Sequence, residues 1–215
     1  MMTKTNEKIV CPRRLPTEGV FIHYDSNDIL YSLMYSMATF NPKEKRLYLE
    51  KKVFVREKKT IYQSCGFTNS AIMKRHLKKL IDKGLVAETD KIFYFPYNEN
   101  EKYQIISNEM LWYIASTRPL QGVRIYIMLL DWFLWKEKTN DTFVFTNKDI
   151  LKRLGYSCDN KTASSMVSNM LESYSKEGVI QCEYFYEKNI SENGKEIPVP
   201  KIRLLSVARR KSEIK

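Results

Sequence analysis

The sequence predicts a mainly α-helical protein with small β wings, of the α+β class, in which one unit occurs twice. A helix, a glycine and a short hairpin follow one another from Phe67 to Pro96, and the same pattern recurs 94 residues later. Of the 215 residues, 43% are hydrophobic and 13% aromatic, which is enough apolar surface for a folded core. Helix, glycine and hairpin together are typical of a winged helix-turn-helix, so we expect two such domains in tandem.

The first domain is predicted over residues 25–100. Its first helix is expected at 28–38 and its second at 59–66. Residues 41–59 carry alternating apolar side chains that fit a strand, but they also fit an extension of the second helix, so this boundary is open.

The third helix of this domain is the expected recognition helix. Thr68 is a good N-cap, and Met73, Leu77 and Leu80 share one apolar face. Gly84 ends the helix, because a glycine adopts the left-handed conformation of a helix end easily. Short strands are then predicted on either side of a turn at 89–91.

The second domain is predicted over residues 101–207. At the offset of 94, Thr162, Ser164, Leu171 and Gly178 match identical residues of the first domain, and the other core positions remain apolar or aromatic. Thr146 and Asp149 have capping-box spacing, and Gly155 closes that helix. The second wing is longer, with strands at 179–187 and 197–206 joined at Asn193-Gly194. Pro198 and Pro200 favour an edge strand there.

A helix at 122–136 is apolar on nearly all sides and must therefore be buried all round. We expect it to pack between the two domains, with a homodimer interface as the alternative. A short strand and a helix with Leu111 and Trp112 are predicted before it, and the domain boundary is expected near Asn100. Residues 1–24 form an N-terminal arm and 208–215 a basic C-terminal tail.

The net charge of +11 favours a polyanionic partner, because neutralising phosphates releases condensed counterions. On the recognition helix, Ala71, Lys74, Arg75, Lys78 and Lys79 form an outer side without an acid. Exposed charges normally mix signs, so this one-signed side predicts contact with double-stranded DNA. Asn69 and Ser70, at the start of the helix, are expected near base edges or a phosphate.

The second recognition helix predicts different chemistry. Its outer side carries the candidate DNA-binding residues Lys161, Thr162, Ser165, Ser168 and Asn169. Such hydroxyl and amide groups bind bases or phosphates without strong long-range attraction, so this helix either reads sequence or binds protein. Two further basic segments, 43–59 and 209–211, are candidates to follow phosphates. For 209–211, and equally for Arg13-Arg14 near the N-terminus, a solvated chain end is the alternative.

Several classes of chemistry are not expected. The seven glycines include no phosphate-binding loop, and two histidines, His23 and His76, leave no zinc motif and no Ser-His-Asp triad to assign. We therefore expect a protein that is not an enzyme and needs no cofactor, metal or nucleotide. The sequence offers no membrane span and no secretory signal, and four scattered cysteines fit reduced thiols, so we expect a cytoplasmic protein.

The segment YQIISNEMLWYIASTRPLQGVRIYIMLLDWFLWK, followed by FTNKDILKRLGYS, a recognition helix and Gly178, resembles the winged-helix units of plasmid and phage replication initiators and replisome organisers of Gram-positive bacteria. The resemblance covers residues 25–207. It implies a DNA-binding protein that recognises repeated origin sequences and recruits replication machinery. Within these 215 residues we expect no counterpart of the additional C-terminal recruiting domain that some such initiators carry. A transcriptional regulator of a mobile element and a winged-helix adaptor for protein contacts are the alternatives, and homodimer formation is open.

Overall fold

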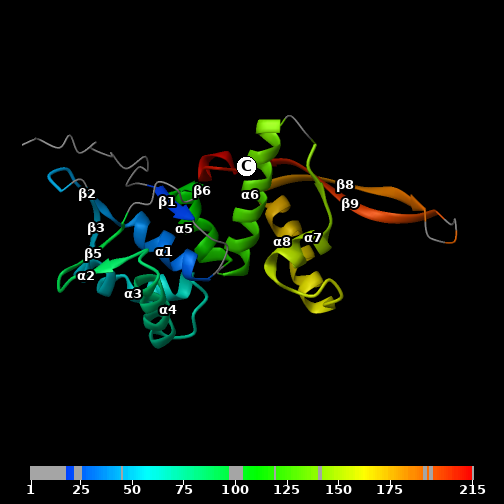
Figure 1. The fold of residues 1–215 in the computed structure, drawn as a ribbon. Helices are drawn as coiled ribbons and strands as arrows, with labels where there is room; N and C mark the ends of the chain where they lie inside the picture. Colours follow the sequence, from blue (N-terminus) through cyan, green and yellow to red (C-terminus); the bar gives the residue numbers. More distant parts are fainter. Residues whose placement is uncertain are drawn as a thin grey trace, which may run out of the picture.

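The structure is a computed structural model that describes residues 18–21, 26–44, 46–96, 104–118, 120–139, 142–190, 193 and 196–214. It is of the α+β type, with helices packed around small antiparallel sheets. The described part is elongated (Figure 1), with one helical unit at each side and a long hairpin that projects beyond the second unit. We call residues 26–96 the first unit and residues 121–207 the second unit.

The first unit contains four helices and a four-stranded sheet. Its helices are α1 (Ser26–Ser36), α2 (Lys51–Arg56), α3 (Lys58–Ser64) and α4 (Ser70–Asp82). Its strands are β2 (Thr39–Asn41), β3 (Arg46–Glu50), β4 (Ala87–Glu88) and β5 (Ile92–Tyr94), in the order β2-β3-β5-β4. The segment 41–59, whose structure the sequence left open, is a strand in its first half and a helix in its second.

The ends of α4 follow from local chemistry. Asn69, not the predicted Thr68, is the N-cap, because its side-chain oxygen accepts hydrogen bonds from the amides of Ala71 and Ile72, both at 3.0 Å. Gly84 follows the helix with a φ of +70°, as predicted. Met73 and Leu80 are buried, while Leu77 is half-buried at the edge of the same face.

The second unit contains α6 (Gln121–Thr139), β7 (Val144–Phe145), α7 (Asn147–Leu154), α8 (Lys161–Lys176), β8 (Ile180–Ile190) and β9 (Glu196–Val207). The predicted capping box of Thr146 and Asp149 is confirmed, and Gly155 closes α7 with a φ of +82°. The strand order is β7-β9-β8. β9 is the middle strand only at Ile202 and Arg203, and at Pro198 and Pro200 it pairs with β8 alone, so the predicted edge position of the two prolines is confirmed. Pro198 and Pro200 are tolerated because β7 reaches only Ile202 and Arg203.

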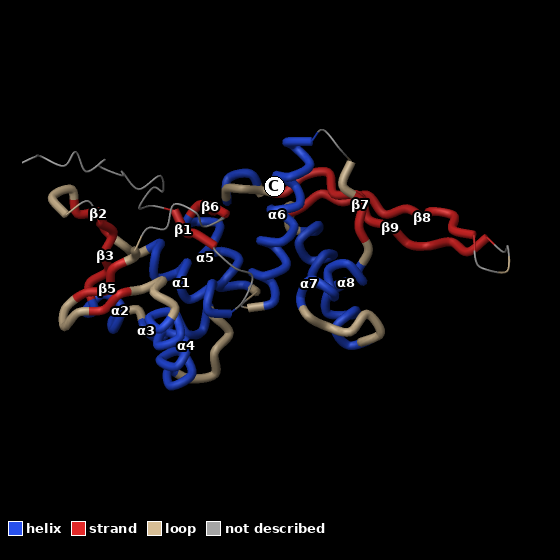
Figure 2. Tube along the Cα trace, in the orientation of Figure 1, coloured by secondary structure: helices blue, strands red, loops and turns tan. Residues whose placement is uncertain are grey.

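The two units share their order of elements and their strand pairing (Figure 2). In each, a helix and a strand (β3 or β7) precede further helices and a hairpin, and that strand pairs antiparallel with the last strand. The first unit has three helices at this place, α2, α3 and α4, and the additional strand β2, whereas the second has two helices, α7 and α8. Positions 94 residues apart play the same part: Leu80 and Tyr174 are buried, and Gly84 and Gly178 both have a φ of +70°. The internal repeat is therefore structural as well as sequential. The tip residue Gly194 lies outside the described residues.

The helix α5 (Asn108–Thr117) joins the two units. It packs on α1 and α3 of the first unit and on α6 of the second. Its Asn108 Nδ2 donates to the Ser36 carbonyl at 3.1 Å, and its Trp112 Nε1 donates to the Ser36 hydroxyl at 3.1 Å. The long apolar helix α6 packs mainly on α5, α7 and β9, so the helix between the units is α5, which corrects the expectation for residues 122–136. The predicted boundary at Asn100 lies outside the described residues.

Both ends of the chain contribute to this joint. β1 (Glu18–Phe21), part of the predicted N-terminal arm, pairs antiparallel with β6 (Gln104–Ser107). At the other end, Ala208 is buried and a 3₁₀ turn, Lys211–Glu213, packs on α5. The C-terminal tail is therefore ordered through residue 214, and Arg209 pairs with Glu137 of α6.

Candidate nucleic-acid interface

The outer face of α4, formed by Ala71, Lys74, Arg75, Lys78 and Lys79, is exposed as the sequence predicted. The helical repeat places these side chains opposite Met73 and Leu80, which lie in the core. None of the four basic side chains forms an ion pair with a residue that the structure describes. Asp82, at the end of the helix, is its single acid.

The start of α4 is less available than expected. The side-chain oxygen of Asn69 is occupied by the helix cap, and Ser70 is half-buried. Base or phosphate contact from these two residues therefore requires groups other than the Asn69 oxygen. The four basic side chains farther along α4 remain the accessible part of the predicted site.

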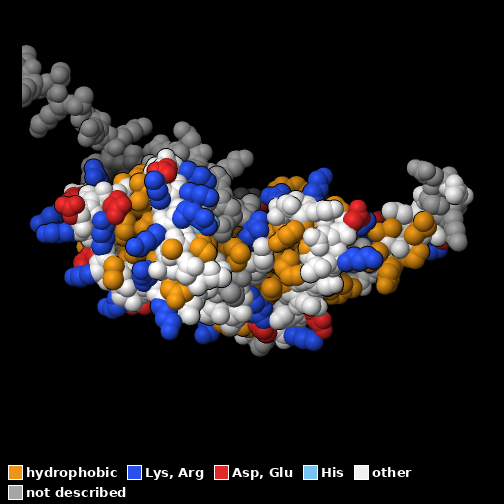
Figure 3. All heavy atoms as spheres, turned by 90° about the horizontal axis from the view of Figure 1, so that it is seen from below, with side chains coloured by type: hydrophobic (Ala, Val, Ile, Leu, Met, Phe, Trp, Pro, Cys, Tyr) orange, Lys and Arg blue, Asp and Glu red, His pale blue; other side chains and the backbone are white. Residues whose placement is uncertain are grey.

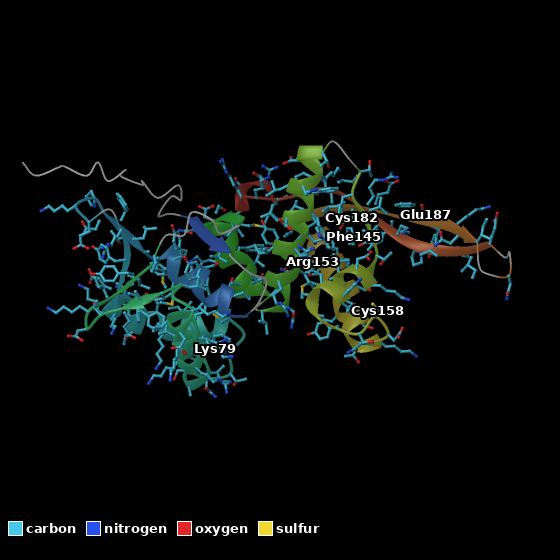
Figure 4. All side chains as sticks on the ribbon, in the orientation of Figure 1. Lys79, Phe145, Arg153, Cys158, Cys182 and Glu187 are labelled. Atoms are coloured by element: carbon cyan, nitrogen blue, oxygen red, sulfur yellow. The ribbon has the colours of Figure 1, made fainter. Side chains whose placement is uncertain are left out.

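Charge is distributed unequally between the two halves of the chain. Residues 25–100 carry 14 Lys and Arg against 9 Asp and Glu, whereas residues 101–207 carry 14 against 13. In Figure 3, which views the molecule from the side of α4, Lys and Arg side chains gather over the first unit. Figure 4 shows Lys79 on α4 at the outer edge of that unit, far from Glu187 on the long hairpin.

The basic segment 43–59 is partly neutralised by its own acids. Lys51 pairs with Glu88 at 2.6 Å, while Lys52 and Arg56 pair with neighbouring glutamates. Lys43 and Lys59 are exposed and form no ion pair within the described residues. This segment thus adds fewer free cations beside α4 than its composition suggested.

The outer face of α8 is exposed but polar. Lys161, Thr162, Ser165, Ser168 and Asn169 all reach the surface, as predicted. Ser168 accepts a hydrogen bond of 2.7 Å from the Asn147 side chain, and the nearby Glu172 pairs with Lys176 at 2.6 Å. The two candidate faces therefore differ: α4 presents four basic side chains without an ion pair to a described residue, whereas α8 presents one, Lys161, among hydroxyls, an amide and the Glu172–Lys176 ion pair.

One edge of α8 is attached to the end of α5. Arg118 pairs with Glu177 and donates to the Ser173 hydroxyl, and Tyr113 donates to Glu177 at 2.7 Å. The Arg118 guanidinium also lies 4.9 Å from the Tyr174 ring centroid. Sequence reasoning missed this cluster, because its two halves, Tyr113 and Arg118 on one side and Ser173 to Glu177 on the other, are 55 residues or more apart and none belongs to a recognisable motif.

This cluster sets the protonation of its groups. Burial raises the pKa of Glu177, but hydrogen bonds from Arg118 and Tyr113 outweigh it, so the pKa of the carboxyl lies below its ordinary value of 4.5. The Tyr113 pKa is raised, because ionisation would break its hydrogen bond to Glu177. Glu177 is therefore ionised at neutral pH, and the cluster stabilises the packing of α5 on α8.

A groove of about 910 Å³ separates α8 from the long hairpin. It is lined on one side by Ser168, Leu171 and Glu172 and on the other by Tyr184, Tyr186 and Pro200. Large apolar side chains also remain exposed along the hairpin, and Figure 3 shows hydrophobic atoms there. The alternation along residues 179–187 indicated a strand but not that its apolar side would lack cover.

Other kinds of site are not assembled by the described residues. They contain no group of three or more His, Cys, Asp or Glu side chains that could hold a metal ion. His76 stacks on Phe67, with ring centroids 4.5 Å apart, so it acts as a packing residue, while His23 lies outside the described part. Among the described helices, none has the length and apolarity needed to span a membrane.

Comparisons with known proteins leave the chain without relatives to reason from. No protein-family model, no curated protein and no solved structure matches it.

Proposed function

We propose that the chain is a tandem winged-helix protein that binds double-stranded DNA, with α4 as its main DNA-binding helix. The element order and the strand pairing that the two units share support the tandem assignment, because a winged helix consists of such a helical core followed by a hairpin. In this arrangement α4 and α8 are the two recognition helices and the hairpins β4–β5 and β8–β9 are the wings.

The observation that carries the proposal is the unpaired charge on the outer face of α4. Lys74, Arg75, Lys78 and Lys79 are exposed on one side of a single helix and form no ion pair with a described acid. A duplex presents closely spaced phosphates, so it neutralises several such cations at once. In the second unit, by contrast, Lys176, Lys188, Lys201 and Arg203 are each paired with a glutamate.

For the biological role we propose a plasmid or phage replication initiator that binds origin DNA in the cytoplasm. The support is the resemblance of residues 25–207 to such proteins. A transcriptional regulator of a mobile element shares all of the DNA chemistry and is the alternative. A genome-wide footprint separates the two: an initiator occupies iterated repeats near its own gene, and a regulator occupies promoters.

A second role, protein contact, is favoured for the second unit alone. Its outer α8 face carries a single lysine without an ion pair to a described residue, Lys161, and its hairpin exposes tyrosines. Replication machinery is the partner that the initiator role implies.

The proposal predicts the salt dependence of DNA binding. Lys78→Ala/Lys79→Ala should reduce the slope of log K against log salt by about 0.9 for each phosphate that the variant no longer neutralises. Binding to a duplex selected from a random library is measured between low and physiological salt, with circular dichroism to check folding. The matched control is Lys148→Ala/Lys152→Ala, which removes two exposed lysines from α7 and should leave the slope unchanged. An unchanged slope in the α4 variant, or no DNA binding by the wild type, contradicts the proposal.

A further inference from the structure

The hairpin β8–β9 extends well beyond the body of the second unit. Its strands pair from Ile180 with Val207 out to Ile190 with Glu196. The third strand, β7, covers only the positions of Ile202 and Arg203. From Pro200 to the tip the sheet is therefore two-stranded, and Figures 1 and 2 show it projecting away from the helices.

The two faces of this projection are unlike. One face continues the side of β9 that places Ile202 and Leu204 in the core. We call it the inner hairpin face; it consists of Tyr184, Tyr186, Lys188, Ile190, Glu196, Pro198 and Pro200. Tyr184 is 58% exposed, Tyr186 73% and Ile190 78%.

On the opposite face of the hairpin, the basic side chains form ion pairs with glutamates of the neighbouring strand. Arg203 pairs with Glu183 at 2.6 Å and lies 4.9 Å from the Phe185 ring centroid, while Lys201 pairs with Glu187 at 3.2 Å. Such cross-strand pairs stabilise a sheet that faces water. The inner hairpin face offers apolar area instead, although an isolated two-stranded hairpin is only marginally stable in water. An exposed apolar face of this kind marks an interaction surface.

We propose that the inner hairpin face is a homodimer interface in which two copies of the chain pack their hairpins face to face and antiparallel. The charges on the surface point to a second copy. An ion pair lies on each side of the two tyrosines: Lys188–Glu196 at 2.8 Å between Tyr186 and the tip, and Glu172–Lys176 at 2.6 Å on α8. A two-fold axis perpendicular to the apolar stripe of these tyrosines places the Lys188–Glu196 pair of each copy beside the Glu172–Lys176 pair of the other. Each lysine then lies near a glutamate of the other copy.

The groove beside α8 and the exposed area of the hairpin tyrosines both fit the hairpin of a second copy. Glu172 and Lys176 line the same groove as Tyr184 and Tyr186, so in this arrangement the partner's Lys188 and the partner's Glu196 enter a space lined by side chains of opposite charge. A fully covered aromatic side chain buries about 150–250 Å². Tyr184 and Tyr186 are 58% and 73% exposed, so together they supply roughly a third of the ~800 Å² that each partner contributes to a standard interface.

DNA is a poorer occupant of this surface. The described residues of the inner hairpin face include one lysine and one glutamate, which already pair with each other. The interface is also separate from the outer face of α4, so it is tested without DNA and does not depend on the proposed function.

The test is the mass of the full chain in solution. By analytical ultracentrifugation from about 1 to about 100 µM, a range suited to interfaces of this size, the wild type should approach twice the monomer mass of 25.5 kDa. Tyr186→Glu, which places a charge in the middle of the stripe, should remain a monomer. The matched control is Ile197→Glu, an exposed apolar residue on the opposite face of the same hairpin, which should dimerise like the wild type.

A charge exchange tests the orientation of the two copies. Lys188→Glu and Glu172→Lys should each weaken the dimer, and the double variant should recover more affinity than the two single effects predict. A wild type that stays monomeric at the highest concentration overturns the proposal, as does a dimer that survives Tyr186→Glu or fails to form in Ile197→Glu. Strictly additive charge variants overturn the antiparallel arrangement.

Discussion

Glu177 keeps its charge in a partly covered position because Arg118 and Tyr113 both donate hydrogen bonds to it. These bonds hold the pKa of the carboxyl below its ordinary value of 4.5. A group with a lowered folded-state pKa stabilises the fold at pH values above its unfolded pKa. That contribution is lost as the pH falls through the folded value.

Glu177→Gln should therefore lower the stability of the protein at pH 7, and its difference from the wild type should shrink as the pH falls below about 4.5. Urea unfolding of both proteins from neutral pH to about pH 3 measures this difference. The matched control is Glu44→Gln, whose carboxylate is exposed and forms no ion pair with a described residue, so it should leave the stability nearly unchanged. A difference between Glu177→Gln and the wild type that stays constant across this range would show that Glu177 has no lowered pKa.

At the scale of residues, the sequence predicted helix caps and helix ends, which depend only on near neighbours in the chain. The Thr146–Asp149 capping box and the glycines after α4 and α7 were predicted correctly, because such features require particular residues within one turn. The cap of α4 was wrong by one position, since Thr68 and Asn69 are both good N-caps and adjacent in the chain. The Arg118–Glu177 contact could not be predicted, because it depends on how two helices pack.

The first turn of α6 meets the end of α5 at Gly122. A Cβ at this position would overlap the Cβ of Arg118 and lie 3.0 Å from the Tyr174 hydroxyl. Within a helix, replacing glycine by alanine ordinarily stabilises by about 1 kcal/mol. Here the backbone of Gly122 lies too close to Arg118 for an added methyl group, and overpacking of this kind costs about 1–3 kcal/mol of stability.

Gly122→Ala should consequently destabilise the protein, by up to about 2 kcal/mol once the helical gain is subtracted. The urea midpoint measures the effect. Ser165→Ala on the exposed side of α8 is the control, because it improves helix propensity without a new contact, and it should be neutral or slightly stabilising. A Gly122→Ala protein that is more stable than the wild type would contradict the close packing of α6 against Arg118.

At the scale of elements, the helices and the longer wing were predictable because periodicity and turn residues mark them. The segment 41–59 was ambiguous for a physical reason: strand β3 passes directly into α2 at Lys51, with no glycine or proline between them. The outer face of α4 was foreseen from the helical repeat, and its residues are exposed. The uncovered side of the hairpin was not, since alternation cannot reveal how far a sheet extends past its helices.

At the scale of the whole molecule, the buried residues of both units belong to one continuous core. α5 packs on α1, α3 and α6, and β1 pairs with β6, which immediately precedes α5. Separating the chain near residue 100 would divide this sheet and uncover α5. The domains predicted from the repeat are therefore joined more closely than a flexible linker would allow.

This continuity predicts a single cooperative unfolding transition. Calorimetry should show one peak whose heat-capacity change is roughly 2.6–3.2 kcal/mol/K, the sum expected for 215 residues, and whose van't Hoff and calorimetric enthalpies agree. Met73→Ala in the first unit and Leu171→Ala in the second remove buried side chains, which costs about 2–5 kcal/mol in each case. If the units unfold together, both variants shift the same peak to lower temperature. Two peaks, with each variant shifting only one of them, would show that α5 does not couple the two halves.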